Sequence, residues 1–429
     1  MSMKLKGLNV LVDGYNLELQ RGTGIKTYGV GLIKALKLLE ANVHILFSNK
    51  RSESDPILNE VLFLDNLINN SNAQSILDLA RNIMNDTIKA VCGIPYKPKQ
   101  ITLNREVVIK ERFIKNLSKS AEFFALPQCY KIANIRYRLF GITTTAAFYK
   151  KMDIWHATYP LPIKIRKAKK ITTIHDLIPI RLPYATLDCK ELFYRNVKNS
   201  IKDSEIIVTI SENTKNDLLT IFDISPDKIC VTYEPIALKS TIINEEQLST
   251  FLRKYKLKFR NYIFFVGAIE PKKNIGRLID AYSMIDTDMP LIIVGQKAWL
   301  WENEISGRNL DNVHLLGHIP TDDLPYLYTG AYCFVFPSLY EGFGLPPLEA
   351  MTFGCPVIVS NVASLPEVCG DAALYVDPYD SADIKDKIEH LLNNPPLRDE
   401  LSKTGKERTK LFSMENYVKR LSDVYAKIL

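Results

Sequence analysis

The chain alternates short apolar stretches with longer segments in which apolar residues recur every three or four positions. Short stretches rich in Val, Ile and Phe are typical of buried strands, whereas the longer pattern is typical of amphipathic helices. Strand, loop and helix follow in this order in both halves of the chain, which predicts parallel sheets covered by helices. The expected strands are residues 8–12, 43–47, 154–156, 171–174, 206–210, 262–266, 291–294, 313–315, 333–336, 356–359 and 373–376.

Residues 233–258 separate two runs of this alternation, because they combine Glu234-Pro235 with a strongly charged stretch. A length of 429 residues also fits two domains at roughly 100 to 200 residues each. We therefore expect an α/β protein with two doubly wound, Rossmann-like domains that face each other across a cleft. The expected boundaries are 1–240 and 241–410, followed by a helix within 411–429 that packs back on the first domain.

Residues 51–150 fit neither pattern clearly. The basic and aromatic part of this region, residues 110–149, we interpret as helices that border a surface. Near the start of the chain, residues 21–29 read as a glycine loop and residues 30–40 as the helix that follows it.

Composition excludes several classes of protein. Apolar residues make up 46% and charged residues 24%, which is close to the globular average and argues against disorder or a coiled-coil rod. The seven cysteines include no CxxC pair, so we expect neither a disulfide framework nor a zinc knuckle. The apolar run before Asp13 is too short for a signal peptide and no stretch is long enough to span a bilayer, so a cytoplasmic location is expected.

Charge is distributed unevenly along the chain. Residues 101–200 carry 19 Lys and Arg against 7 Asp and Glu, whereas residues 201–400 carry 17 against 29. Such a basic segment points to an anionic partner, which leaves nucleic acid, an anionic membrane surface and a phosphorylated acceptor open, beside a solvated face without a partner. No RNA- or DNA-binding motif accompanies the charge, so nucleic acid is disfavoured.

The most informative motif is a glycine loop between two carboxylates, Glu341 and Glu349, eight positions apart. Pro346 and Pro347 fit the first turn of a helix, which leaves the backbone N–H groups of residues 343–345 free at its N-terminus. A helix N-terminus favours phosphate, and carboxylates beside it accept hydrogen bonds from sugar or ribose hydroxyls. This combination describes a nucleotide sugar.

These residues resemble the E-x7-E motif of the family 4 retaining glycosyltransferases, which have the GT-B fold. The surrounding sequences FPSLYEGFGLP, GCPVI, LPEV, GDAA and VDP are similar to the donor-domain blocks of that family in order and spacing. The resemblance implies that the first domain binds an acceptor and the second a nucleotide sugar. It implies that Glu341 contacts the donor sugar, Glu349 contacts the ribose, and the loop residues Gly342, Phe343, Gly344 and Leu345 bind the diphosphate.

A second loop, GAIEPKKN, is similar to the phosphate loop of the same family and begins at Gly267. The resemblance assigns Lys273 to the leaving diphosphate, where a lysine stabilises the charge that develops as the glycosidic bond breaks. Ala268 stands where many members have arginine, and Lys272 is the residue that could compensate.

In the first half, the resemblance implies that the loop containing Gly24 faces the donor phosphate and the acceptor. Because this loop does not fit G-x-G-x-x-G, a dinucleotide site is disfavoured. The resemblance also implies that His175, at the end of an expected strand, contacts the donor sugar. His156 ends another strand and is the weaker candidate.

A retaining transfer without a metal is the expected reaction. Asp322-Asp323 and Asp286-Thr-Asp288 occur in loop or helix-start contexts, so protein cations are expected to replace magnesium, and no other cofactor is expected. A glycosidase also uses two carboxylates, but it has no need of a phosphate site. Glu341 and His175 are the expected catalytic residues, which orient the sugar.

The resemblance implies transfer of a hexosyl unit to a saccharide or lipid-linked acceptor in bacterial cell-surface polysaccharide synthesis, with GDP-mannose as the first donor to test. The inner face of the plasma membrane is a further expected location. Two alternatives stay open: a GT-B nucleotide-sugar epimerase, and a non-catalytic nucleotide-sugar-binding subunit of a glycan assembly complex.

Overall fold

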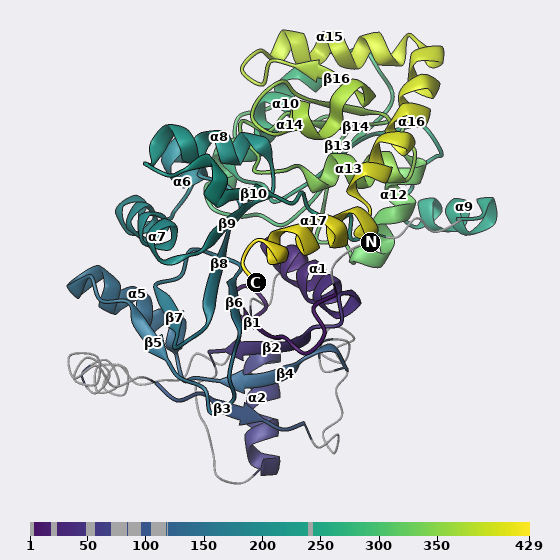
Figure 1. Cartoon of the computed structure of the whole chain (residues 1–429). Coiled ribbons are helices and arrows are strands. Elements are labelled where there is room, and N and C mark those ends of the chain that lie inside the picture. Colours follow the sequence, from purple (N-terminus) through teal and green to yellow (C-terminus); the bar gives the residue numbers. More distant parts are fainter. Residues whose placement is uncertain are drawn as a thin grey trace.

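The computed structural model of the chain describes residues 4–18, 24–48, 56–69, 84, 96–103, 117, 119–238 and 243–429. Two large sheets organise it, one from strands that precede residue 232 and one from strands that follow residue 262 (Figure 1). Helices cover both sheets, and the fold class expected from the sequence is confirmed.

The first sheet has the strand order β10-β9-β8-β6-β1-β2-β4-β3 within the described residues. Neighbouring strands are parallel except β3 and β4, which are antiparallel. Its strands are β1 (Asn9–Asp13), β2 (Asn42–Phe47), β3 (Lys99–Ile101), β4 (Glu122–Ala125), β6 (Ile154–Ala157), β8 (Lys169–Ile174), β9 (Ile206–Thr209) and β10 (Ile229–Val231), and the short strands β5 (Thr144–Ala146) and β7 (Ile163–Ile165) pair separately.

The second sheet is parallel throughout and has the order β13-β12-β11-β14-β15-β16. In sequence order this reads 3-2-1-4-5-6, the order of a Rossmann sheet. Its strands are β11 (Ile263–Val266), β12 (Leu291–Val294), β13 (Val313–Gly317), β14 (Cys333–Phe336), β15 (Val357–Ser360) and β16 (Ala373–Val376).

Most helices follow strands in the βα order. Those of the first half are α1 (Gly24–Leu38), α2 (Pro56–Asn69), α5 (Cys129–Phe140), α6 (Ile178–Arg181), α7 (Lys190–Asp203) and α8 (Glu212–Ile221). Those that follow are α9 (Glu245–Lys254), α10 (Ile275–Ser283), α11 (Trp301–Ile305), α12 (Leu324–Gly330), α13 (Leu345–Thr352), α14 (Leu365–Cys369), α15 (Ser381–Leu392), α16 (Pro395–Thr409) and α17 (Met414–Ala426).

Two expectations about the first half were wrong in part. Helix α1 begins at Gly24, so the second part of the expected glycine loop is helical, while residues 21–23 lie outside the described part. Within residues 110–149, where helices were expected, α5 is a helix, but β4 forms a strand that pairs with β2, and Phe123 and Phe124 on it are buried. A short apolar run fits a strand or a buried helix equally well, and here the pairing with β2 decides.

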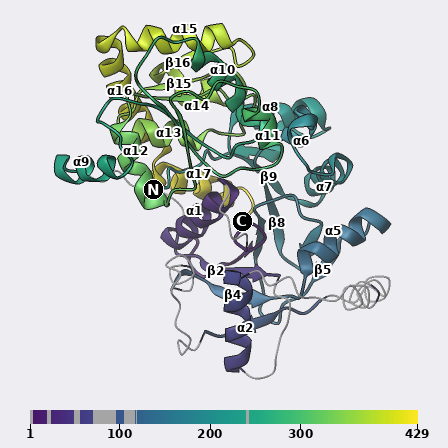
Figure 2. The ribbon, with the colours of Figure 1, turned by 180° about the vertical axis from the view of Figure 1, so that it is seen from behind.

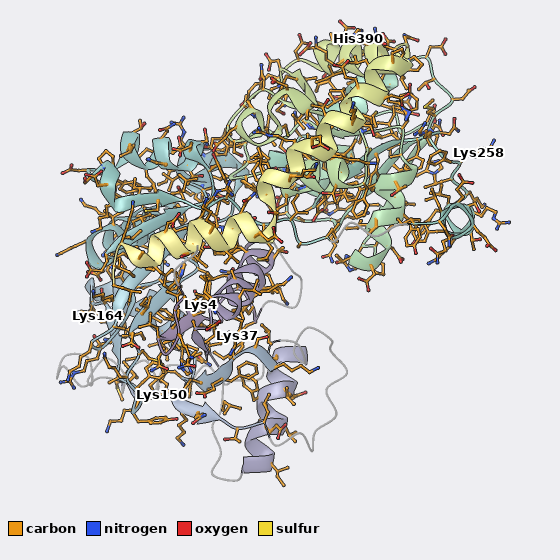
Figure 3. The ribbon with its side chains drawn as sticks, turned by 45° about the vertical axis from the view of Figure 1, so that its right-hand side comes forward. Lys4, Lys37, Lys150, Lys164, Lys258 and His390 are labelled. Atoms are coloured by element: carbon orange, nitrogen blue, oxygen red, sulfur yellow. The ribbon has the colours of Figure 1, made fainter. Side chains whose placement is uncertain are left out.

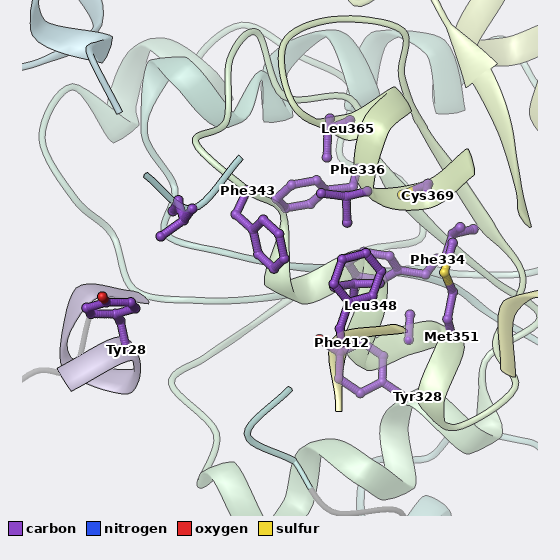
Figure 4. Packing of buried hydrophobic residues seen from close by; sticks show 14 of the residues in the cluster. Tyr28, Tyr328, Phe334, Phe336, Phe343, Leu348, Met351, Leu365, Cys369 and Phe412 are labelled. Atoms are coloured by element: carbon purple, nitrogen blue, oxygen red, sulfur yellow. The ribbon is translucent and has the colours of Figure 1, made fainter. Parts of the chain in front are cut away.

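The core of the second half is built around β14 and α13. Phe334 on β14 is fully buried, and Leu348 and Met351 of α13 lie beside it (Figure 4). Because both faces of a parallel sheet are covered by helices, its strands are almost continuously apolar, and this is why the sequence located them well.

The last helix, α17, packs against α1 of the first half, and both views show it running back from the second sheet (Figures 1 and 2). Tyr425 on α17 is hydrogen-bonded through its hydroxyl to Nδ1 of His156 at 2.8 Å, and the ring of Tyr417 meets that of Tyr28 edge-on at 6.3 Å. The carboxyl end of the chain is therefore an integral part of the first half's packing.

Candidate active site

The order of strands in the second sheet determines where its loops open. β11 and β14 are neighbours, and the chain leaves them toward opposite edges of the sheet. At such a switch point the loops after the two strands diverge and form the crevice in which α/β sheets bind ligands. These loops are residues 267–274 and 337–344, the two segments singled out from the sequence.

The two loops are joined by an ion pair. Nζ of Lys273 lies 2.6 Å from Oε1 of Glu341, and the two side chains are only 12% and 11% exposed. Burial alone would raise the pKa of Glu341, but the positive charges of Lys273 and Lys272 outweigh it and hold the pKa below its ordinary value. Glu341 is therefore a carboxylate at neutral pH, and Lys273 also lies over the ring of Phe336 at 4.8 Å.

Lys272 extends this charged cluster toward the first half. Its Nζ is 3.3 Å from Oε1 of Glu270. Burial lowers the pKa of Lys272, yet the negative charges of Glu270, Glu341 and Asp176 raise it well above its usual value overall. Asp176 is the second residue after β8, so a residue at the edge of the first sheet acts on a lysine of the second.

Glycine is needed in the loop after β14 for two different reasons. A Cβ atom on Gly342 would lie 2.5 Å from the carbonyl oxygen of His175, so only glycine allows the two halves to approach so closely. Gly344 has φ +113°, where side chains are strained, and a Cβ there would lie 2.8 Å from Leu365.

At the N-terminus of α13 the backbone N–H groups are not capped by a side chain. Gly344 occupies the cap position and no side chain caps the helix. The ring of Phe343 is buried, stacked on Tyr233 at 6.1 Å and edge-on to Phe412 at 5.5 Å, so only its backbone could serve a ligand. If this loop binds a diphosphate, the hydrogen-bond donors that it offers are therefore the backbone N–H groups of residues 343–345.

His175 lies at the edge of the first sheet, with its ring held from both sides. Nε2 donates to the carbonyl oxygen of Thr158 at 2.9 Å, and Nδ1 lies 3.4 Å from Oε1 of Glu234. The ring of Tyr28 stands edge-on to it at 4.7 Å. The structure therefore brings His175 beside Gly342 through its backbone, while its imidazole is fixed within the first half.

The two remaining candidates of the first half are placed differently. His156 is fully buried between Tyr425 and Thr173, and burial, together with the nearby His175, lowers its pKa to about 3. His156 is therefore a neutral histidine that takes part in internal hydrogen bonds, and His175 is the better candidate for a contact with the sugar. Gly24 is the first residue of α1, and among the described residues no atom lies within 4 Å of where its Cβ would be.

Sequence reasoning missed Asp176, Glu234 and Glu270, and also Tyr328, whose hydroxyl is hydrogen-bonded to the carboxylate of Glu349. Asp176 follows a candidate histidine and Glu270 precedes two candidate lysines, so proximity along the chain was a usable signal for both. Glu234 fell in the segment read as a domain boundary, and nothing in its own neighbourhood pairs it with His175.

Similarity to known proteins agrees with this geometry. Residues 250–408 match the family described as Glycosyl transferases group 1. The O-antigen chain mannosyltransferase B of Escherichia coli is 36% identical over 284 residues, which cover 63% of this chain and 74% of that protein. The chain belongs to the group 1 glycosyltransferases. It is therefore an enzyme of the glycosyltransferase class.

Two further relatives of this glycosyltransferase carry similar descriptions. The O-antigen chain mannosyltransferase RfbU of Salmonella typhimurium is 31% identical over 244 residues, covering 56% of the chain and 64% of that protein. The serotype-specific mannosyltransferase WbdA of Escherichia coli is 30% identical over 275 residues, covering 61% of the chain but only 34% of that protein. The chain thus spans about a third of the length of WbdA.

Solved structures establish the fold of the glycosyltransferase as GT-B. The sucrose-phosphate synthase of Thermosynechococcus elongatus aligns with a TM-score of 0.66 at 17% identity, over 98% of this chain and 99% of that one. Alr3699/HepE of Anabaena, in complex with UDP and glucose, aligns with a TM-score of 0.65 at 12% identity, over 98% and 100%.

The second carboxylate of the glycosyltransferase motif differs from the first in its electrostatics. Glu349 on α13 is half-buried, and its Oε2 accepts a hydrogen bond from the hydroxyl of Tyr328 at 3.1 Å. Burial raises the pKa of Glu349 to about 7, although the hydrogen bond from Tyr328 lowers it in part. The two glutamates, eight residues apart, therefore carry different charge near neutral pH.

This difference predicts a pH-dependent effect of Glu349→Gln on stability. The pKa of Glu349 is about 7 in the folded chain against an ordinary value of 4.5, so folding becomes less favourable as the pH rises between these two values. Glutamine carries no charge at any pH. The variant should gain ~2 kcal/mol relative to the wild type between pH 5 and pH 8, measured by urea unfolding.

Glu407→Gln is the matched control, because Glu407 is 63% exposed on α16. Its stability difference from the wild type should not change with pH by a comparable amount. A flat difference for Glu349→Gln as well would contradict a raised pKa at Glu349.

Proposed function

We propose that this enzyme transfers a hexosyl unit from a nucleoside-diphosphate sugar to a saccharide or lipid-linked saccharide, with retention of configuration, in cell-surface polysaccharide synthesis. The observation that carries the proposal is the Lys273–Glu341 pair at the switch point of the second sheet, beside the uncapped N-terminus of α13. The O-antigen mannosyltransferase descriptions of the relatives support the acceptor class and make GDP-mannose the first donor to test.

In this proposal each group has one task. Lys273, Lys272 and the N–H groups of residues 343–345 bind the diphosphate and stabilise the charge that it gains on departure. Glu341 accepts hydrogen bonds from hydroxyls of the donor sugar, and Glu349 from those of the ribose. The acceptor hydroxyl attacks on the face from which the diphosphate leaves, and a phosphate oxygen takes its proton, so positioning provides most of the catalysis.

The ion pair has a consequence for donor binding. Because Lys273 already touches Glu341 at 2.6 Å, an arriving diphosphate shares the lysine with the carboxylate. The donor therefore enters a site whose charges are already arranged, and little reorganisation is needed on binding. His175 takes part as a group that shapes the sugar site from the first half, through its contact with Gly342.

A panel of nucleotide sugars tests the function directly. A donor that binds only the folded chain raises its melting temperature, so thermal shift with GDP- and UDP-sugars identifies the base and sugar class. The best ligand is then assayed for transfer to saccharide acceptors. Conversion of the donor to another nucleotide sugar without an acceptor would indicate an epimerase, and binding without turnover would indicate a non-catalytic subunit.

Glu341→Gln is expected to separate binding from turnover. The substitution keeps the shape but removes the charged acceptor for sugar hydroxyls, so turnover should fall about 100-fold or more. Nucleoside diphosphate should bind at least as tightly as in the wild type, because Lys273 is released from its partner. Steady-state kinetics and calorimetry measure the two effects, and unchanged turnover would refute the role of Glu341.

Lys273→Ala should instead weaken the diphosphate contact. Loss of a charged hydrogen bond is expected to raise the Kd for nucleoside diphosphate roughly tenfold. Calorimetry measures the effect, with Lys385→Ala on α15 as a control for loss of a lysine elsewhere. Equal affinity for Lys273→Ala, together with a loss for Lys272→Ala, would make Lys272 the phosphate ligand.

We further propose that the transfer needs no metal ion. In the described part of the chain, no three or more His, Cys, Asp or Glu side chains come together in a way that could hold a metal. The cations Lys272 and Lys273 occupy the place where charge neutralisation is needed. Turnover should be unchanged after treatment with EDTA, and recovery of a lost rate by added Mg²⁺ or Mn²⁺ would contradict this.

Membrane association is the remaining proposal, and it concerns the outer surface of the first half. No helix among the described residues is both long and apolar enough to cross a bilayer. Within the basic residues 101–200, Arg136 and Lys170 are buried and bonded internally, so they cannot face lipid. Exposed cations remain at Arg138, Arg166 and Lys167, and at Lys119, Lys164 and Lys169 (Figure 3 labels Lys164).

Not all aromatic residues of 110–149, the segment expected to border a surface, lie on a surface. Phe123, Phe124 and Tyr130 are core residues, because β4 and the start of α5 pack inside the first half. The end of α5 is different, since Leu139 and Phe140 there are 63% and 54% exposed beside Arg138. Residues Lys110, Arg112, Phe113 and Lys115 lie outside the described part.

Co-sedimentation with liposomes tests this surface. Each cation near an anionic bilayer contributes about 1 kcal/mol and is screened by salt. Binding should therefore rise with the fraction of anionic lipid and fall as salt is raised, and Arg138→Glu should weaken it. Binding that ignores both lipid charge and salt, or no binding, would reject the membrane and favour a soluble, phosphorylated acceptor.

A further inference from the structure

Residues 339–342, which include Glu341, contact the first half of the molecule through Leu339, Tyr340 and Gly342. Leu339 comes from the second half, yet its side chain is buried in an apolar cluster with Ile178, Leu182 and Ala185 around α6. Its backbone N–H donates to the carbonyl oxygen of Lys272 at 2.8 Å, which ties the segment to the phosphate loop.

The next residue, Tyr340, is bonded to α8 of the first half. Its hydroxyl accepts a hydrogen bond from Nδ2 of Asn213 at 2.9 Å and donates to the carboxylate of Asp217. Asp217 is itself fixed by Arg181, whose Nε is 3.2 Å from Oδ1. The tyrosine hydroxyl therefore has both its donor and its acceptor capacity used across the two halves.

On the other side of Glu341, Gly342 is bonded to the same helix. Its carbonyl oxygen accepts from the hydroxyl of Ser211 at 2.7 Å, and Ser211 is also the N-cap of α8. The carboxylate of Glu367 accepts from the backbone N–H groups of Glu212 and Asn213 at 2.7 and 3.0 Å. A residue of the second half thus also caps the helix of the first, where the helix dipole favours a negative charge.

We propose that α8 is the element that positions Glu341, with Tyr340 and Asp217 as positioning residues for the transfer. Residues immediately before and after Glu341 are both bonded to α8. These contacts with the first half add to the bonds of the Ser364 hydroxyl to the carbonyl oxygens of Glu341 and Phe343, which lie within the second half. The nucleotide is proposed to bind the second half alone. Loss of the Tyr340–Asp217 bond should therefore lower turnover while leaving nucleotide affinity nearly unchanged. This inference rests on the proposed transferase function.

Tyr340→Phe is the direct test, because it removes the hydroxyl and keeps the ring in the apolar cluster. We expect kcat to fall about tenfold, the scale of one lost hydrogen bond to a charged group, with the Kd for nucleoside diphosphate within about twofold. Tyr375→Phe is the matched control, since the Tyr375 hydroxyl bonds to the carbonyl of Gly370 within the second half. It should leave kcat unchanged.

Asp217 provides the partner test. Asp217→Asn retains an oxygen that accepts from the tyrosine hydroxyl, so it should stay within about threefold of the wild type, whereas Asp217→Leu should match Tyr340→Phe. Because both changes remove the same bond, the double variant Tyr340→Phe/Asp217→Leu should fall no further. Wild-type kcat in Tyr340→Phe, an equal loss of nucleotide affinity, or additive effects would each overturn the proposal.

Hydrogen exchange gives a readout that does not depend on activity. Tyr340→Phe should speed exchange of the backbone amides of residues 340–344 about tenfold or more, while those of residues 348–351 keep their protection. Unchanged exchange in residues 340–344 would overturn the proposal even in an active enzyme. If the wild type transfers no sugar from any donor, the proposed function fails, and faster exchange in Tyr340→Phe would still support the positioning by α8.

Discussion

The buried ion pair between Lys273 and Glu341 is the interaction on which the site depends. It joins the loops after two neighbouring strands at the one place in the second sheet where those loops diverge. Removing two charges from water costs several kcal/mol, and only close mutual contact offsets that cost. The pair therefore contributes little to stability by itself, but it fixes the position of a cation and a carboxylate that the proposed function assigns to the diphosphate and to a sugar hydroxyl.

A geometric constraint adds to this electrostatic one. Gly342 lies against the backbone of His175, and no residue with a Cβ atom fits there without a shift of the main chain. The two halves consequently meet within one residue of Glu341, and the polar contacts of α8 with Tyr340 and Gly342 follow from that approach. A site assembled in this way belongs to both sheets, although most of its side chains come from the second.

The electrostatic contrast between the two glutamates has the same origin. Glu341 lies near two lysines and stays ionised. Glu349 lies on α13 beside the hydroxyl of Tyr328, and burial raises its pKa to about 7. Two identical residue types thus differ in charge because their neighbours differ. A carboxylate beside a diphosphate would repel it, so a neutral or easily protonated Glu349 is compatible with a nucleotide close by.

The sequence by itself determined the second sheet, the strands β1, β2, β6, β8 and β9 of the first, the loops that carry Glu341 and Lys273, and the helix that begins after Gly344. Strands buried on both faces are continuously apolar, and glycine and proline mark the loops between them, so these features are local and can be read from neighbouring residues. It did not determine β3, β4 or β10, because a short run fits a strand or another structure until a partner strand is known. The pairing of Glu234 with His175, of Asp176 with Lys272 and of Tyr340 with Asp217 was decided only by the tertiary structure. Each pair joins residues far apart along the chain, and their contact follows from strand order and from the approach of the two halves, which no local pattern encodes.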